Sequence, residues 1–374
     1  MNNLLVCAKM GCVLGRFAAI AALVALLLLT CCGASAAGAT QGGPRFSFVE
    51  WRYSSQELEK ARVETFLVSA RPNGSGRHRL FGKGRRINPT IFHGGSWSPD
   101  GSRVAFSGTP IAGGREGKPR IYILRAGRGR PRALPKTLGG THPVFSPDGS
   151  RIAFKRSRFR FHFNRKNPLK SRSYASATSW MLDLASGKAR QLTPWRNGLF
   201  NSPYSFSPGG TVLALDRSRP GRGTEAVSYD LGSRKTTTIA VEATEPVFSP
   251  DGSRVALVSY RDHLTVDGFD GPEARGEIYT VAPDGSDPVR VTHAPRAYES
   301  EPSWDPSGSR LAYTSNNDEL SAFLGLENSV MAINVDGTCP TTVISRRRSR
   351  RGGSAYYGPA WQPGPGREAG PISC

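Results

Sequence analysis

The amino-acid sequence predicts an all-β fold assembled from one repeated antiparallel unit. Three observations lead to this prediction: a ten-residue pattern returns along the chain, a second hairpin pattern follows each copy, and 43 Gly and 28 Pro supply tight turns between short elements. A mean hydropathy of −0.38 excludes a protein with many membrane spans. The 38% of hydrophobic residues and 9% of aromatic residues are enough to build a large core.

The first element along the chain is a secretory leader. Lys9 and Arg16 supply positive charge without any acid, and Phe17–Leu29 is an uninterrupted apolar run. The small residues of Ala34–Ala36 then form a cleavage motif, so the sequence predicts a signal peptide over residues 1–36. The apolar run is shorter than the roughly 20 residues that span a bilayer.

The mature chain is therefore expected to work outside the cytoplasm, either secreted or in the cell envelope. Residues 37–44 are a short linker, and lipid anchoring through Cys31 is an alternative to simple cleavage. Two cysteines follow the leader, Cys339 and Cys374, and an oxidising compartment favours a disulfide between them. Two unpaired thiols are the alternative.

A ten-residue pattern is repeated through the rest of the sequence. Its first copy, WSPDGSRVAF, runs from Trp97 to Phe106, and a truncated last copy begins at Trp361. Successive copies start 48, 61, 42, 56 and 57 residues apart, which fits a supersecondary unit of about four strands. The copies between them are FSPDGSRIAF (Phe145–Phe154), FSPGGTVLAL (Phe206–Leu215), FSPDGSRVAL (Phe248–Leu257) and WDPSGSRLAY (Trp304–Tyr313).

Each copy contains a tight turn between two strands. Pro99 sets φ for the first central position of the turn, Asp100 tolerates the second, and Gly101 adopts positive φ without strain. The residues after the turn alternate, so Val104 and Phe106 point to one face of a strand. Each copy is therefore predicted to open with a buried hairpin.

A second hairpin follows in every unit. In one unit, Met181–Leu184 leads through a Ser-Gly turn to the strand pattern of Arg190–Thr193. Two hairpins make four short antiparallel strands, which is the blade of a β-propeller. The corresponding first strands elsewhere are Ile121–Leu124, Val227–Leu231, Ile278–Val281 and Val330–Val335.

The number of units predicts a six-bladed β-propeller over residues 45–364, followed by a C-terminal tail, 365–374. Five full copies give five blades, and the strand around Trp361 has no unit of its own. Strands from both termini would together make the sixth blade, a clasp that leaves no open edge in the ring. The N-terminal strand patterns are Phe46–Val49, Thr65–Val68 and Arg79–Phe81.

The repeat resembles that of the TolB-type propellers, which are distantly related to WD-repeat proteins. The resemblance rests on the recurring motif [WF]-S-P-D-G-x-x-[IVL]-A-[FYL] with a downstream R-x-L-T-like strand, and it covers nearly the whole mature chain. It implies a propeller fold and, by analogy, a protein-interaction surface.

The sequence lacks the usual catalytic motifs. The nucleophile elbow G-x-S-x-G, the S-x-D-x-G-x-x-W box of sialidases and the phosphate-binding loop G-x-x-x-x-G-K-[ST] are all absent. Six histidines are scattered without metal-ligand spacing. We therefore expect no catalytic residue, no cofactor and no metal.

Polar residues mark the loops that enter the innermost strand of each blade, which is where propellers hold ligands at the mouth of the central channel. Such groups converge to form a ligand site, or they are solvated loop residues. The candidates are His93, His142, Ser202, Glu245, Glu301 and Tyr357.

A basic insertion between two strands of one blade is the second candidate site. The segment 155–172 contains no acid, and Phe alternates with Arg in its first half. The insertion should project on the side of the channel mouth. It suits an anionic polymer, a membrane surface or a single-stranded nucleic acid, of which secretion argues against the last, unless it is a solvated loop. Its candidate residues are Arg156, Arg158, Arg160, Arg165 and Lys166.

The sequence predicts an exported, non-catalytic scaffold that binds a protein or an anionic envelope polymer at its channel face. Lys and Arg total 50 against 29 acids, a formal charge of +21 that favours polyanion contact. The alternative is a glycan-acting lyase or hydrolase with a His/Glu site in the channel mouth, and a rigid spacer is a third. The protein is expected to be a monomer, to bind no nucleic acid, and to contact a membrane only if Cys31 is lipidated.

Overall fold

The computed structural model describes residues 43–54, 63–82, 87–89, 95–112, 115–126, 128–162, 172–268, 271–294, 297–316, 328–345, 347–349, 352–364 and 370–374. Within these ranges every regular element is a β-strand, and the strands pair antiparallel except at one contact. The described part of the chain contains no helix that is long and apolar enough to cross a membrane. The predicted leader lies outside these ranges.

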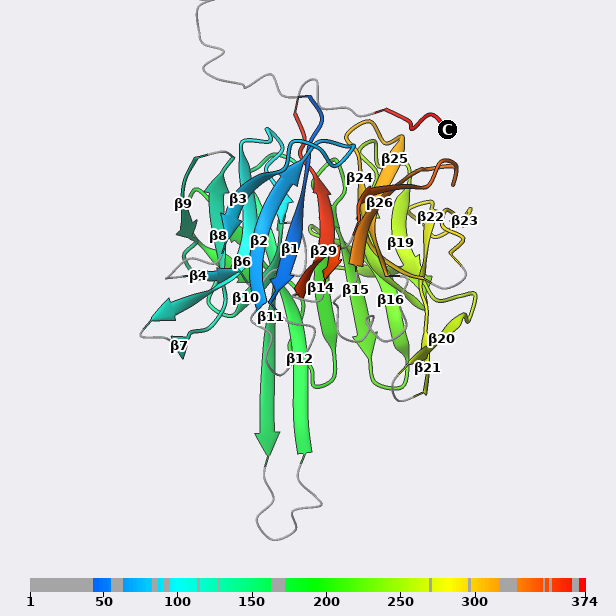
Figure 1. The fold of residues 1–374 in the computed structure, drawn as a ribbon. Helices are drawn as coiled ribbons and strands as arrows, with labels where there is room; N and C mark the ends of the chain where they lie inside the picture. Colours follow the sequence, from blue (N-terminus) through cyan, green and yellow to red (C-terminus); the bar gives the residue numbers. More distant parts are fainter. Residues whose placement is uncertain are drawn as a thin grey trace, which may run out of the picture. The chain divides into compact units, whose positions relative to one another are not determined.

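One sheet contains both the first and the last strands of the described chain (Figure 1). Strand β1 (Phe46–Tyr53) pairs antiparallel with β29 (Gly352–Trp361), and Phe46 lies opposite Trp361. This pairing ties the N-terminal and C-terminal segments together. The sheet is completed by β2 (Val63–Ala70) and β3 (His78–Gly82) beyond β1, and by β28 (Arg347–Ser349) beyond β29.

The next sheet along the chain is built around β6 (Arg103–Ala112). The S-P-D-G turn of the first repeat connects β5 (Ser96–Trp97) to β6, as the sequence predicts. The remaining strands of this sheet are β4 (Ile87–Pro89), β7 (Arg115–Glu116), β8 (Arg120–Arg125) and β9 (Arg128–Ala133).

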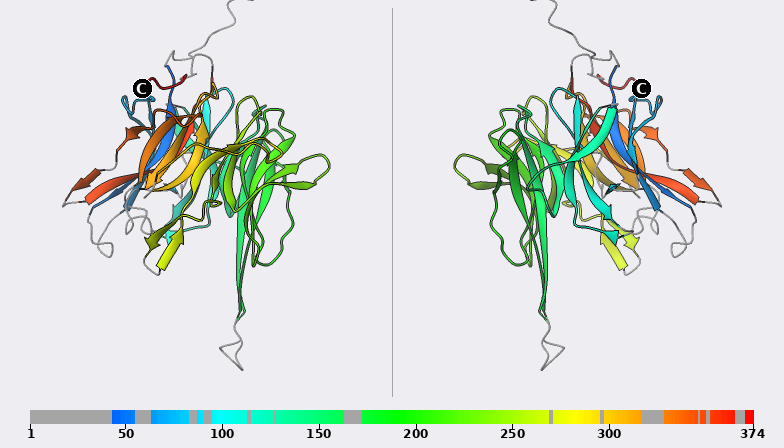
Figure 2. Two further views of the ribbon diagram at one scale, coloured as in Figure 1. Left: turned by 90° about the vertical axis from the view of Figure 1, so that its right-hand side faces the viewer. Right: turned by 90° about the vertical axis from the view of Figure 1, so that its left-hand side faces the viewer.

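The largest sheet is two four-stranded groups joined by a single parallel contact, Ala177 with Phe200. Its central strands β11 and β12 are the longest of the described chain and extend as a hairpin beyond the other strands (Figure 2). The first group is β10 (Gly140–Phe145), β11 (Arg151–His162), β12 (Arg172–Asp183) and β13 (Ala189–Gln191). The second group is β14 (Phe200–Phe206), β15 (Val212–Arg219), β16 (Gly223–Asp230) and β17 (Thr236–Val241).

Two more four-stranded sheets follow, each opened by another copy of the turn. The first is β18 (Ala243–Phe248), β19 (Val255–Ser259), β22 (Glu277–Val281) and β23 (Val289–Arg290), with a separate hairpin of β20 (Thr265–Gly268) and β21 (Gly271–Ala274). The second is β24 (Tyr298–Trp304), β25 (Arg310–Asn316), β26 (Asn328–Asn334) and β27 (Thr341–Ile344).

The turns of the repeat are held by their own side chains. Asp100 Oδ1 accepts hydrogen bonds from Ser98 Oγ (2.5 Å) and from the backbone N–H of Ser102 (3.1 Å). Asp148 and Asp251 make the same bonds in their copies. The hydrogen bonds from the neighbouring serines lower the pKa of Asp148 to about 2. These aspartates are therefore turn-forming groups.

Apolar side chains fill the space between successive sheets. Phe48 is fully buried in a cluster that includes Ala312 of β25 and Val330 of β26, so the first sheet packs against the last one. On its other face the first sheet packs Leu67 against Trp97 of the following sheet. Four further clusters join the remaining neighbours in chain order. The first two link β6 and β8 to β11 and β12, and then β11 and β12 to β15 and β16. The last two link β16 and β17 to β19 and β22, and then β19 and β22 to β24 and β25.

The C-terminal tail is attached beside the turn between β26 and β27. Cys339 and Cys374 are joined by a disulfide, with their Cα atoms 5.3 Å apart, a usual separation for such a bridge. Asn334 supports the same contact, because its Nδ2 donates to Ile372 O (2.9 Å) and its Oδ1 accepts from Ile372 N (2.7 Å).

The first turn of the repeat also contacts the C-terminal segment. Gln362 Nε2 donates a hydrogen bond to Gly101 O (2.6 Å), and a Cβ at Gly101 would overlap the carbonyl oxygen of Pro363. Gly149 occupies the same turn position in the second copy with a similar φ, +67° against +64°, but the nearest atom to a Cβ there is Pro99 Cδ at 3.3 Å. Of these two turn glycines, Gly101 is the one that permits a close backbone approach, to the C-terminal segment at Pro363.

This difference predicts unequal costs for the same substitution in two copies of the turn. Gly149→Ala should lower the free energy of unfolding by about 1–2 kcal/mol through backbone strain alone. Gly101→Ala carries the same strain and also pushes Pro363 away, so it should cost at least about 3 kcal/mol in urea unfolding. Equal losses in the two variants would contradict a tight contact between the first turn and the C-terminal segment.

Candidate functional site

The innermost strands carry an irregularity at equivalent places. The pairing register shifts between Thr141 and Val144 in β10, and β14, β18, β24 and β29 show similar shifts. His142, Glu245 and Glu301 sit at these bulges with φ of 52°, 57° and 57°. A bulge redirects a side chain out of the usual strand alternation. All three side chains consequently line one cavity of about 660 Å³, which is bordered by residues from every main sheet.

Two of these bulge residues accept hydrogen bonds from the next sheet along the chain. Glu245 Oε2 accepts a hydrogen bond from the backbone N–H of Glu301 (2.5 Å). Glu301 Oε2 in turn accepts from the backbone N–H of Gly358 (2.6 Å) and from Thr314 Oγ1 (2.7 Å). Each carboxylate therefore satisfies a backbone donor that the bulge leaves without its usual strand partner.

A partly buried basic and acidic pair lies beside them. Burial lowers the pKa of Lys155 on β11 and raises the pKa of Asp216 on β15, and each charge partly offsets the shift of the other. Asp216 accepts a hydrogen bond from the backbone N–H of Ser202 (3.1 Å) and another from the Tyr204 side chain. Burial also raises the pKa of Tyr204 well above its usual value. The polar part of the cavity thus combines carboxylates, an ammonium group and a phenol.

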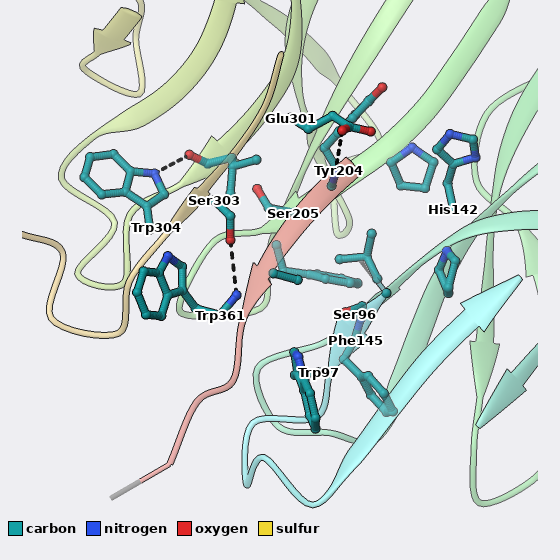
Figure 3. Close-up of a pocket in the computed structure, with 18 of the residues that line it drawn as sticks. Ser96, Trp97, His142, Phe145, Tyr204, Ser205, Glu301, Ser303, Trp304 and Trp361 are labelled. Carbon is teal, nitrogen blue, oxygen red and sulfur yellow. Dashed lines mark hydrogen bonds between the residues drawn. The ribbon is translucent and has the colours of Figure 1, made fainter. Parts of the chain in front are cut away.

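The other part of the cavity is apolar. It is lined by the aromatic residue that opens each repeat copy and by the prolines of the turns, such as Pro99 and Pro250, which are exposed. Figure 3 shows His142, Tyr204 and Glu301 together at one end and tryptophan side chains at the other. The aromatic residues are Trp97, Phe145, Phe206, Phe248, Trp304 and Trp361.

The sequence places some of the candidate residues one or two positions away from the cavity. Ser202 is 4% exposed and does not line it, whereas Tyr204 does. Tyr357 is also buried outside the lining, and Gly358 lies there instead. The bulges cause this offset, because an extra residue changes which side chain faces the axis. His93 lies outside the described residues.

The basic insertion forms the long hairpin of β11 and β12. Arg151 lies opposite Asp183 and His162 lies opposite Arg172, so the hairpin leaves the sheet at the end where β10 enters it. Arg156 and Arg158 lie near its base, and the side chain of Arg160 is not described. Arg165 and Lys166 lie outside the described residues.

The described residues contain no cluster of three or more His, Cys, Asp or Glu side chains arranged to hold a metal ion. The sequence does not mark Lys155, Asp216 or Tyr204 as site residues. What could have pointed to them is their position, because each lies close to a candidate residue in the strand register. Lys155 lies opposite Thr141, which precedes His142, and Asp216 lies opposite Ser202.

The fold and the cavity together define a β-propeller. No family model matches this chain, and no curated protein matches it. Among solved structures it is similar to TolB from Acinetobacter baumannii, with 18% sequence identity and a TM-score of 0.59 over 86% of this chain and 67% of that one. The putative TolB from Agrobacterium tumefaciens is 19% identical, with a TM-score of 0.54 over 86% of this chain and 100% of that one. The chain therefore has a TolB-like β-propeller fold.

A third similar structure is a chain from a nidogen/laminin complex. It is 11% identical and has a TM-score of 0.50, over 84% of this chain and 98% of that one. Identities this low establish a common fold and no common ligand.

One acidic side chain next to the bulge of β24 is buried without full hydrogen bonding. Glu299 is 2% exposed, its Oε1 accepts a hydrogen bond from Ser315 Oγ (3.1 Å), and its Oε2 has no partner among the described residues. Burial raises the pKa of Glu299 to about 8; Glu277 adds to this shift, and Ser315 and Arg275 oppose it. The group is therefore mostly protonated at neutral pH.

This pKa predicts a loss of stability as the pH rises. Between the usual pKa of 4.5 and about 8, the unfolded chain ionises Glu299 while the folded chain retains the proton, so the free energy of unfolding falls across this window. Glu299→Gln cannot ionise and should remove that part of the slope, which is on the order of a few kcal/mol. Urea unfolding from pH 5 to 8 measures it. Glu64→Gln, at an exposed position, is the control, and an unchanged slope in Glu299→Gln would refute the assignment.

Proposed function

We propose that this protein is an exported, non-catalytic β-propeller scaffold that binds a protein or an anionic envelope polymer at its channel face. The observation that carries the proposal is the central cavity, which combines an apolar end of aromatic and proline side chains with a polar end. Concave, mainly apolar surfaces with a few converging polar groups are typical of ligand sites. A propeller of similar fold belongs to a nidogen/laminin complex, which supports a protein ligand by analogy.

The proposal includes a closed ring of six blades. The two halves of the largest sheet would count as separate blades, because a single parallel contact joins them. The first sheet would be the blade that both chain ends complete, with the pairing of β1 and β29 as the clasp. Packing of Phe48 against Ala312 and Val330 supports the closure.

Export is proposed from the leader. The motif at residues 1–36, followed by the linker 37–44, would direct the chain out of the cytoplasm, and lipid anchoring at Cys31 is the alternative to simple cleavage. The disulfide of Cys339 and Cys374 suits an oxidising compartment. We further propose a monomer that needs no cofactor and binds no nucleic acid.

Blocking the apolar end of the cavity should abolish partner binding. Pro99 and Pro250 are exposed there, and glutamate at both positions would place charge where an apolar segment of the partner must dock. Immobilised wild-type protein should capture a defined partner from envelope fractions, and the Pro99→Glu/Pro250→Glu variant should retain less than about a tenth of it. Pro288→Glu, in an exposed turn away from the cavity, is the matched control. Two outcomes would contradict channel-face binding: the wild type captures no partner, or the Pro99→Glu/Pro250→Glu variant captures as much as the Pro288→Glu control.

The alternative function is a lyase or hydrolase acting on glycans. It is favoured by the presence of His142, Glu245 and Glu301 in one cavity, since a histidine near carboxylates can act as a base. The hydrogen bonds that both carboxylates make to backbone N–H groups support a structural role instead.

A direct assay separates the two functions. Purified protein incubated with a panel of polysaccharides, with and without divalent metal, should release no product if the scaffold proposal is right. Product formation that falls at least about a hundredfold in His142→Ala would establish the enzyme in its place. Activity that is indifferent to His142→Ala would exclude this site as its source.

A further inference from the structure

A second concave surface lies beside the base of the β11–β12 hairpin. It is a groove of about 730 Å³ between the hairpin and the segments that precede β8 and β10. Thr141 and Ser157 line both this groove and the central cavity, so the two are adjacent. The side chains that give the groove its character are Lys118, Leu138, Arg156, Arg158, Phe159, Trp180 and Trp195.

The groove is cationic and contains no acid. The guanidinium of Arg156 stacks over Trp180 with 4.1 Å to the ring centroid, and that of Arg158 stacks over Trp195 with 4.0 Å. Neither arginine forms an ion pair with a described residue, and the same is true of Lys118. The Nε of Arg156 is buried without a hydrogen-bond partner in the described chain. Arg156 Nη2 already donates a hydrogen bond to the carbonyl oxygen of Lys136, whereas Arg158 is exposed. A guanidinium that stacks on an aromatic ring, as that of Arg158 does, keeps its edge donors available for a carboxylate.

The groove also exposes apolar surface. Leu138 is 50% exposed and Phe159 is 72% exposed, and they account for two of the four large apolar side chains that are exposed in the described chain. Phe159 directly follows Arg158 on β11, so the strand carries an apolar and a cationic side chain on successive positions. A ligand that matches this pattern needs anionic and apolar groups in alternation.

Among the described strands, none pairs with one edge of β11 along the groove. Strand β10 pairs with β11 as far as Gly140 opposite Arg156, while β12 covers the other edge up to His162. Strand β10 covers its edge of β11 only between Ile152 and Arg156. From Ser157 to His162, no described strand pairs with the same edge. An open strand edge presents a row of backbone donors and acceptors that another extended chain can pair with.

We propose that this groove binds an extended acidic peptide segment of a partner protein by strand addition to the open edge of β11. The acidic side chains of the peptide lie against Arg156 and Arg158, and its apolar side chains lie against Leu138 and Phe159. Such a segment gives the proposed scaffold a second contact with its partner, next to the channel. The observations favour a peptide over an anionic polysaccharide, because guanidinium groups already cover one face of each tryptophan and a sugar has no use for the strand edge.

A synthetic peptide tests this proposal without any knowledge of the natural partner. The probe alternates Glu with Val or Leu over about seven residues, enough to span the open edge at roughly 3.3 Å per residue, and carries a fluorophore. Fluorescence anisotropy with the full chain measures its affinity at several salt concentrations. Three comparison probes are a Lys-for-Glu peptide, the acidic peptide with its backbone N-methylated at alternate positions, and an oligogalacturonate.

Charge reversal at one exposed arginine identifies the groove. Arg158→Glu should weaken binding of the acidic peptide at least tenfold, because it replaces an attraction by a repulsion. Arg222→Glu is the matched control, since Arg222 is exposed in the β15–β16 turn, and it should change the affinity less than twofold. Unchanged thermal unfolding of both variants shows that they are folded.

Each outcome decides the proposal. Saturable binding of the acidic peptide that is lost on N-methylation and weakened by Arg158→Glu supports it. Binding that survives N-methylation, tighter binding of the oligogalacturonate, or no binding of any probe overturns it. Because the cavity prolines are intact in all these proteins, failure here is independent of the capture experiment on the channel face.

Discussion

Burial of apolar side chains between successive sheets is the interaction on which the rest of the structure depends. Val104 packs toward the first sheet, whereas Ala105, the next residue, packs toward the sheet that follows. Each sheet therefore needs a neighbour on both faces. An array that ended at the first sheet would expose Phe48 and Tyr356, both fully buried here, at a cost of about 2 kcal/mol or more for each side chain. Packing between the first and last sheets, together with the β1–β29 pairing, removes this cost.

The same geometry explains why acidic residues gather in the cavity. The innermost strands converge, and bulges in β10, β14, β18, β24 and β29 bend them, which leaves backbone N–H groups without strand partners. Glu245 and Glu301 supply acceptors to these groups in the next sheet. A converging set of carboxylates is therefore a consequence of how the sheets meet, and it carries less information about catalysis than the same residues would carry in an open cleft.

The sequence predicts the fold well because its repeat encodes local turn chemistry. In the first copy, Ser98, Asp100 and Gly101 specify the turn, and the same residue types do so in other copies. The alternation after the turn specifies which face of the strand is buried. The site is less predictable, since the bulges change which side chains face the cavity, so that Tyr204 takes the place of Ser202 in the lining. The groove depends on Trp180, which the β11–β12 pairing places beside Arg156, and on Trp195, which only tertiary packing brings against Arg158.

What the large positive charge indicates about function depends on where the arginine side chains lie and what they contact. Many arginines are engaged within the fold: Arg79 stacks on Phe66, Arg310 stacks on Trp361, and Arg254 donates to the carbonyl oxygens of Thr280 and Asp287. These guanidinium groups are engaged by rings and carbonyl oxygens of the fold, so they raise the net charge without creating a binding surface. What distinguishes Arg158 is that its charge is exposed beside unpaired backbone and apolar surface. Function in so basic a protein is therefore better inferred from arginines that lie next to an unfilled groove than from the total charge.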